Sequence, residues 1–235
     1  MAEALAGALR AALAAAADPA RAEPMRAYMK SAMPFLGVPT PARRAALAGA
    51  LAACPPLDAA TWLGAIHELW RKAAFREERY AAIDLLTGRP GAAWLTPERL
   101  GTVEELIVTG AWWDYVDPVA TRGAWPLLRR HPDRLVPVVE GWAGGPDLWL
   151  RRASIICQVG AGAATDTSLL TACIEPNAGQ RDFFIRKAIG WALRAYSKTD
   201  PNWVRVFLEE RGTRLSPLSR REAGRHLPTA AEEAT

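Results

Sequence analysis

The sequence predicts an all-α protein, built as an α-solenoid of helix pairs. Apolar residues recur at i, i+3, i+4 and i+7 in one segment after another, and no run alternates as a strand would. Short Pro/Gly turns, such as ACPPLD and RRHPD, separate these segments. From residue 40 a pair of segments recurs about every 35–45 residues, the period of two-helix repeats. Self-similarity between the pairs is weak, so a compact helical bundle remains the alternative.

The predicted helices follow one another along the chain with turn-like connections. The Ala-rich start is interrupted by charged residues, which favours a helix over a signal peptide. Three later segments begin with a hydroxyl residue and Pro, a pattern typical of a capped helix start. These are Thr40-Pro41, Thr96-Pro97 and Ser216-Pro217. The segments with helical spacing are 40–54, 58–73, 75–86, 96–108, 131–143, 147–160, 180–198 and 215–227.

Composition narrows the classes of function. Half of the 235 residues are apolar, which is typical of a globular chain, and we expect a single domain over 1–228 followed by a disordered tail at 229–235. No apolar run approaches the roughly 20 residues that span a bilayer. Three cysteines and three histidines are scattered, so we expect a reducing, cytoplasmic environment, no metal site and no cofactor. The net charge of +4 permits nucleic-acid binding without demonstrating it. We expect a monomer.

Segment 180–198 carries an unusual polar face. Its buried stripe is predicted to contain Ile185, Ile189, Ala192, Leu193 and Tyr196. On another stripe Trp191 is flanked by Lys187, Arg194 and Lys198, at i−4, i+3 and i+7. This pattern fits a half-exposed Trp covered by long side chains, or an aromatic platform in a basic groove that binds nucleic acid.

Two further stretches place charges beside aromatic or apolar residues. In GAWWDYVDPVATR, at 110–122, Asp117 before Pro118 suggests an N-cap with a helix over 118–129. A continuous helix would instead place Trp113 and Asp117 on one face, at i and i+4. Arg152 lies on a largely apolar face and therefore needs a partner, either a buried carboxylate or a phosphate.

Five stretches, in order, resemble the DNA alkylation repair family of AlkD-like DNA glycosylases, from about residue 20 to 228. They are YMKSAMPFLGVPTPARR at 28–44, WWDYVD at 112–117, DLWLRRASI at 147–155, FFIRKAIGWALRAYSKTDP at 183–201 and LSPLSRREAGRHL at 215–227. The resemblance implies HEAT-like helix pairs with a concave face that binds DNA.

The resemblance also implies a monofunctional glycosylase that excises cationic N3- and N7-alkylated purines from double-stranded DNA, without flipping the base. Trp113 and Trp191 then correspond to the aromatic pair that faces the lesion, and Asp117 to the catalytic carboxylate. Arg152 corresponds to an arginine that contacts the DNA backbone, and Tyr28 to a residue of the DNA-facing surface.

From their positive charge alone, Lys187, Arg194, Lys198, Arg43, Arg44, Arg220 and Arg221 are candidates to hold DNA phosphates. Two other functions stay open. The chain could be a non-catalytic binder of damaged or branched DNA, or a scaffold whose concave face binds a partner protein. The sequence lacks a phosphate-binding loop and a GxSxG elbow.

Overall fold

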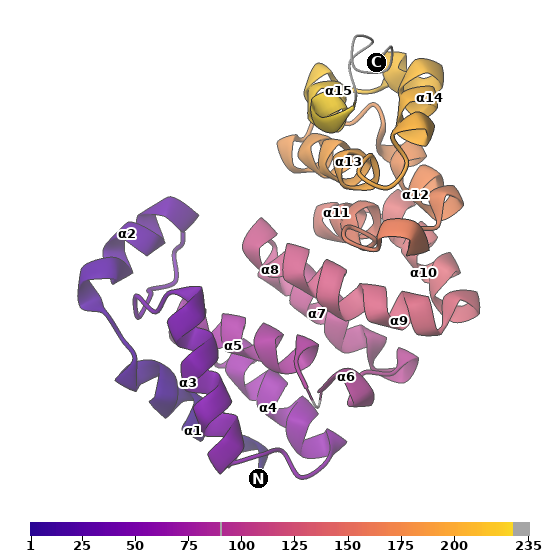
Figure 1. The fold of residues 1–235 in the computed structure, drawn as a ribbon. Coiled ribbons are helices and arrows are strands. Elements are labelled where there is room, and N and C mark those ends of the chain that lie inside the picture. Colours follow the sequence, from indigo (N-terminus) through magenta and orange to yellow (C-terminus); the bar gives the residue numbers. More distant parts are fainter. Residues whose placement is uncertain (90, 228–235) are drawn as a thin grey trace. The chain divides into compact units, whose positions relative to one another are not determined.

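The computed structural model describes residues 1–89 and 91–227, and within these ranges every regular element is a helix (Figure 1). The predicted all-α class is therefore confirmed. The described residues form two compact units, divided between Leu95 and Thr96. The expected single domain over 1–228 stays a prediction, and the tail expected at 229–235 lies outside the described residues. Among the helices described, none is both long and apolar enough to cross a membrane.

The first unit contains six helices in the described ranges: α1 (Ala2–Ala15), α2 (Pro19–Met29), α3 (Thr40–Ala53), α4 (Ala59–Arg71), α5 (Arg76–Thr87) and α6 (Gly91–Trp94). The Ala-rich start forms α1, as predicted, and packs against α3 and α4. Its core face buries Leu5, Leu9 and Leu13. The connection before α3 is held by the buried carboxylate of Glu77, which accepts hydrogen bonds from three successive backbone N–H groups at 36–38.

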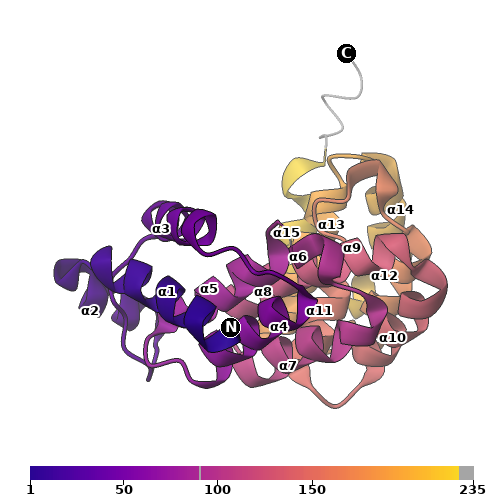
Figure 2. The same ribbon diagram turned by 90° about the horizontal axis from the view of Figure 1, so that it is seen from below.

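The second unit is a stack of helix pairs. Its helices are α7 (Leu100–Gly110), α8 (Trp113–Val119), α9 (Trp125–Arg130), α10 (Pro132–Gly144), α11 (Leu148–Ile156), α12 (Thr167–Ile174), α13 (Phe183–Tyr196), α14 (Pro201–Arg211) and α15 (Pro217–Ala223). In order, α8, α11, α13 and α15 each pack on the next, as Figures 1 and 2 show. Their first residues follow at intervals of 35, 35 and 34 residues, which agrees with the predicted repeat period.

The helix that carries Asp117 differs from one of the two sequence predictions. Asp117 is not an N-cap: α8 starts at Trp113 with Trp112 as its N-cap, and Pro118 lies inside the helix. Pro118 has no N–H, so it cannot donate to the carbonyl of Asp114 one turn earlier. The chain continues through a π-helical turn, Ala120–Ala124, into α9. Such π-turns occur where the regular hydrogen-bond ladder is interrupted.

The helix starts that matter for the site are fixed mainly by aspartates. Asp147 and Asp182 each accept two backbone N–H bonds, at the beginning of α11 and of α13. The predicted cap at Ser216 is confirmed, because its side chain accepts the N–H of Ser219. The predicted cap at Thr40 is wrong, because Thr40 is already the first residue of α3. Thr96 is the N-cap of a short 3-10 turn with Pro97 at its start, as predicted, but its side chain makes no cap bond.

Candidate functional site

The centre of the candidate site is an ion pair between Asp117 on α8 and Arg152 on α11. The guanidinium binds the carboxylate through two hydrogen bonds, Nε to Oδ1 at 2.7 Å and Nη2 to Oδ2 at 2.8 Å. Its third nitrogen, Nη1, donates to the backbone carbonyl of Phe184 on α13 at 2.7 Å. The side chains of Asp117 and Arg152 are 15% and 6% exposed. The buried partner that the sequence requires for Arg152 is therefore Asp117.

Burial and the guanidinium of Arg152 shift the pKa of Asp117 in opposite directions. Burial raises the pKa of the Asp117 carboxyl above its ordinary value of 3.8, since removal from water disfavours the ionised form. The hydrogen bonds and positive charge of Arg152 oppose this rise, and the negative charge of nearby Asp114 adds to it. Each carboxylate oxygen accepts one bond from Arg152 and keeps a further lone pair. The group can therefore still act on a molecule beside it.

A cluster of aromatic rings reaches Arg152 through Phe184. Trp112, Trp149 and Phe184 pack together from the starts of α8, α11 and α13, with ring centroids 4.9–6.2 Å apart. The Arg152 guanidinium lies 6.0 Å from the centroid of Phe184. The Nε1 atom of Trp112 is buried and has no hydrogen-bond partner in the structure. This cluster excludes water from one side of the ion pair, which strengthens the electrostatic interactions within it.

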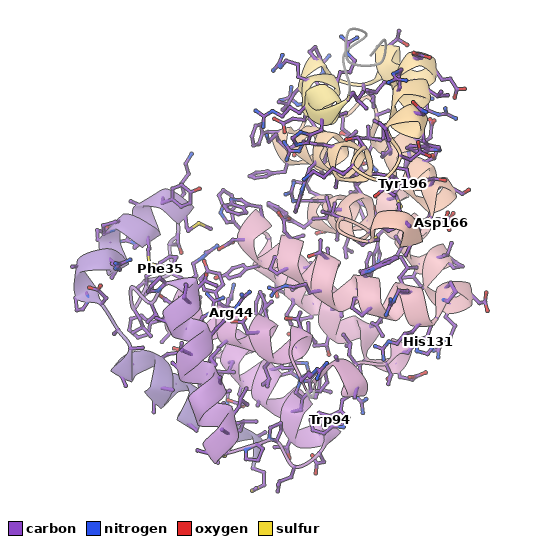
Figure 3. The ribbon with its side chains drawn as sticks, viewed as in Figure 1. Phe35, Arg44, Trp94, His131, Asp166 and Tyr196 are labelled. Atoms are coloured by element: carbon purple, nitrogen blue, oxygen red, sulfur yellow. The ribbon has the colours of Figure 1, made fainter. Side chains whose placement is uncertain are left out.

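The two tryptophans expected to face a lesion are both partly exposed. Trp113 is the first residue of α8, so it lies at i−4 from Asp117 in the same helix. The continuous-helix interpretation of this stretch is thus the right one. Trp191 lies on α13 and is half-buried, as its flanking charges suggest, while Ile185, Ile189, Ala192 and Leu193 form the buried face. Tyr196, labelled in Figure 3, is only half-buried, unlike the core residue predicted.

The cations around Trp191 have a partner that sequence reasoning missed. Glu222 on α15 accepts a hydrogen bond from Lys187 Nζ at 2.9 Å and another from Arg194 Nη1 at 2.5 Å. Its side chain is only 9% exposed. Lys198 lies just beyond the end of α13 and is exposed. The only sequence signal for Glu222 was its place in the LSPLSRREAGRHL stretch, since a single Glu among arginines does not reveal its partner.

The remaining candidates belong to the first unit. Tyr28, at the end of α2, is 77% exposed. Arg44 on α3 is exposed and is labelled in Figure 3. Arg43 is buried, with Nε 2.8 Å from Asp84 Oδ2 and its guanidinium 4.8 Å from the ring centroid of Tyr80. Its positive charge is thus balanced by Asp84, and its burial makes it a weaker candidate for a phosphate contact than Arg44.

Within the described residues, no group of three or more metal-ligating side chains comes together. The chemistry that the second unit offers is that of a fixed, partly buried carboxylate with a tryptophan on the same helix. Such a group can stabilise a positive charge that develops beside it or orient a water molecule.

Comparison with known proteins gives one consistent result. Residues 9–227 match the family model described as DNA alkylation repair enzyme. Among solved structures, the chain is similar to a predicted DNA alkylation repair enzyme from Enterococcus faecalis, with 31% sequence identity and a TM-score of 0.81. The match covers 91% of this chain and 98% of that one. No curated protein matches the sequence.

Proposed function

Because the chain belongs to the DNA alkylation repair enzyme family, we propose that it is a DNA glycosylase acting on cationic N3- and N7-alkylated purines in double-stranded DNA. Membership in this family supports a role in the repair of alkylated DNA. The observation that carries the finer proposal is the Asp117 carboxylate, held in a fixed plane by two bonds from Arg152 and lying one turn from Trp113.

The chemistry of the lesion matches what such a carboxylate supplies. Alkylation at N3 or N7 makes the purine a cation, so that it leaves as a neutral base when the C1′–N9 bond breaks and N9 takes the electron pair. Positive charge then develops on the sugar, and an anion beside it stabilises this oxocarbenium-like transition state. Water adds to C1′ and loses a proton, leaving an abasic site. Asp117 would orient this water and stabilise the sugar.

Trp113 and Trp191 would supply the aromatic faces. A cationic base is attracted to a tryptophan ring by about 0.5–2 kcal/mol, more when water is excluded. Arg152 would fix the plane of Asp117, since three of its five N–H donors bind Asp117 and Phe184, and its two further N–H donors could contact the DNA backbone. We expect the protein to hold the DNA backbone around the lesion without flipping the base, with little dependence on base sequence.

The deciding experiment is base release from a duplex containing N7-methylguanine, comparing the natural protein with Asp117→Asn. Asn keeps the shape of the side chain and one hydrogen-bond acceptor but loses the charge. We expect the rate to fall about 100-fold or more, because a preorganised anion at a developing cation contributes on this scale. Equal rates would remove Asp117 from the chemistry. Duplex binding without release by either protein would favour a non-catalytic binder of damaged or branched DNA.

A further inference from the structure

A row of charged side chains runs through the second unit at the repeat spacing. Asp117 on α8, Arg152 on α11, Lys187 on α13 and Glu222 on α15 follow one another at 35-residue intervals. Ion pairs join the first two and the last two. The row therefore begins and ends with a carboxylate, and each carboxylate binds the cation of the neighbouring helix.

Close packing of α15 against α13 sets the position of Glu222. A Cβ atom built on Gly190 would lie only 2.4 Å from Cβ of Glu222 and 3.0 Å from the carbonyl oxygen of Ser219. Only a residue without a side chain allows this approach. The hydroxyl of Ser219 also donates to the backbone carbonyl of Arg186 at 2.9 Å. The backbone of α15 is thus fixed, and the Glu222 carboxylate reaches cations on either side of Trp191.

We propose that Glu222 is a positioning residue that holds Lys187 and Arg194 beside Trp191, so that both cations bind the DNA backbone next to the lesion and stay off the ring. This inference rests on the proposed function. Long cationic side chains stack readily on tryptophan, and a cation on Trp191 would compete with a cationic purine for the same face. By binding both cations, Glu222 also removes rotamer freedom that would otherwise be lost when DNA binds.

The proposal gives Glu222→Gln two effects of opposite sign. Loss of a negative charge beside two cations should strengthen binding to undamaged duplex about twofold to threefold and steepen its salt dependence. Loss of positioning should slow release of N7-methylguanine about tenfold, as small misplacements of binding groups do. Damage should also be recognised less well. The readout is the ratio of the Kd values for undamaged duplex and for duplex with 2′-fluoro-N7-methyldeoxyguanosine, whose fluorine slows glycosidic cleavage.

Two further variants separate position from charge. Gly190→Ala keeps every charge but forces Glu222 to move, so it should lower the release rate and the damage preference without strengthening binding to undamaged DNA. Glu175→Gln is the matched control. Glu175 also bridges two cations, Arg211 and Arg214, but these are not on the helix that carries Trp191. It should leave the release rate and the damage preference unchanged.

The outcomes are distinguishable. An unchanged release rate and an unchanged damage preference in Glu222→Gln would overturn the inference. So would weaker binding to every duplex together with a lower melting temperature in both Glu222→Gln and Gly190→Ala, because Glu222 would then be structural only. If the natural protein releases no base but Glu222→Gln still loses its damage preference, the glycosylase proposal fails while the role of Glu222 stands.

Discussion

Asp117 on α8 and Glu222 on α15 are both carboxylates that bind basic side chains, and yet their pKa values are shifted in opposite directions. Burial raises the pKa of Asp117 above 3.8, whereas the hydrogen bond from Lys187 lowers the pKa of Glu222 below 4.5. The positive charges of Arg194 and Arg225 lower the pKa of Glu222 further. Asp117 has one cationic partner and a negatively charged neighbour, Asp114.

The difference shows that an ion pair alone does not set the behaviour of a buried carboxylate. Glu222 binds Lys187 and Arg194 directly, and these cations favour its ionised form. Asp117 lies where protein atoms replace water and a single guanidinium does not outweigh that loss. A carboxylate with a raised pKa, such as Asp117, is held less firmly in its ionised state, which is typical of groups that take part in catalysis. Glu222 has the properties of an anion that stays ionised and holds its cations in place, as the proposed positioning role requires.

The largest effect should come from removing the one cation that Asp117 has. We expect Arg152→Met to reduce the free energy of unfolding by about 3 kcal/mol near neutral pH, because it leaves a buried carboxylate unpaired. The pKa of Asp117 should then rise further. Since a raised folded-state pKa favours the protonated form, the loss of stability should be smaller in acid and grow as pH rises through that pKa.

Urea unfolding of Arg152→Met at a series of pH values measures this. Arg134→Met is the matched control, because Arg134 pairs with Glu98 at the surface, where both side chains are more than half exposed. That change should leave the free energy of unfolding nearly unchanged, because ion pairs in water contribute little. A loss in Arg152→Met as small as in this control, at every pH, would mean that Asp117 does not depend on Arg152.

A second expected effect is the order in which activity and stability decline in acid. The rate of base release should fall as pH drops through the raised pKa of Asp117, because the protonated group no longer stabilises the sugar cation. The stabilisation by Glu222 is present above its unfolded-state pKa and is lost only as pH falls through its lowered folded-state pKa. Activity should therefore decline while Glu222 is still ionised.

Single-turnover release and thermal unfolding across the same pH range test this order, with spontaneous depurination subtracted. Any residual release by Asp117→Asn should lack the acid decline of the natural protein. If release and melting temperature fell together, the acid decline would report unfolding and not the titration of Asp117.

Much of the fold was predictable because it depends on local patterns. Helical spacing and short Pro/Gly turns predicted the all-α class, and the intervals of 34 and 35 residues between the starts of α8, α11, α13 and α15 agree with the predicted repeat period. The sequence also predicted that Arg152 has a partner, because an Arg on an apolar helix face requires one. Asp117 was already singled out in sequence, but only the stacking of α8 on α11 shows that the two side chains meet.

Other features of the fold and the site were not predictable, because they depend on contacts between segments far apart in the sequence. The pairing of Glu222 with Lys187 joins residues 35 positions apart and needs the close approach at Gly190. The sequence left open whether Asp117 caps a helix or lies within one, because Asp-Pro is a common helix start. In the structure the helix begins at Trp113, and a π-helical turn follows Pro118. Local propensity favoured one helix start, and tertiary packing selected another.

The smallest effect is expected for Asp114→Asn, which changes the charge near Asp117 and leaves the burial of Asp117 unchanged. Asp114 raises the pKa of Asp117 through its negative charge alone, so Asp114→Asn should move the acid decline of base release to lower pH. This shift is opposite in direction to that expected for Arg152→Met, and smaller, because burial remains. The rate near neutral pH should change by less than about twofold, as for other weak charge interactions near a surface. Measurement needs only the pH profile of single-turnover release. An unchanged acid decline would show that the charge of Asp114 does not act on Asp117, so that burial and Arg152 alone set the pKa of Asp117, and a shift to higher pH would contradict the described direction of its effect.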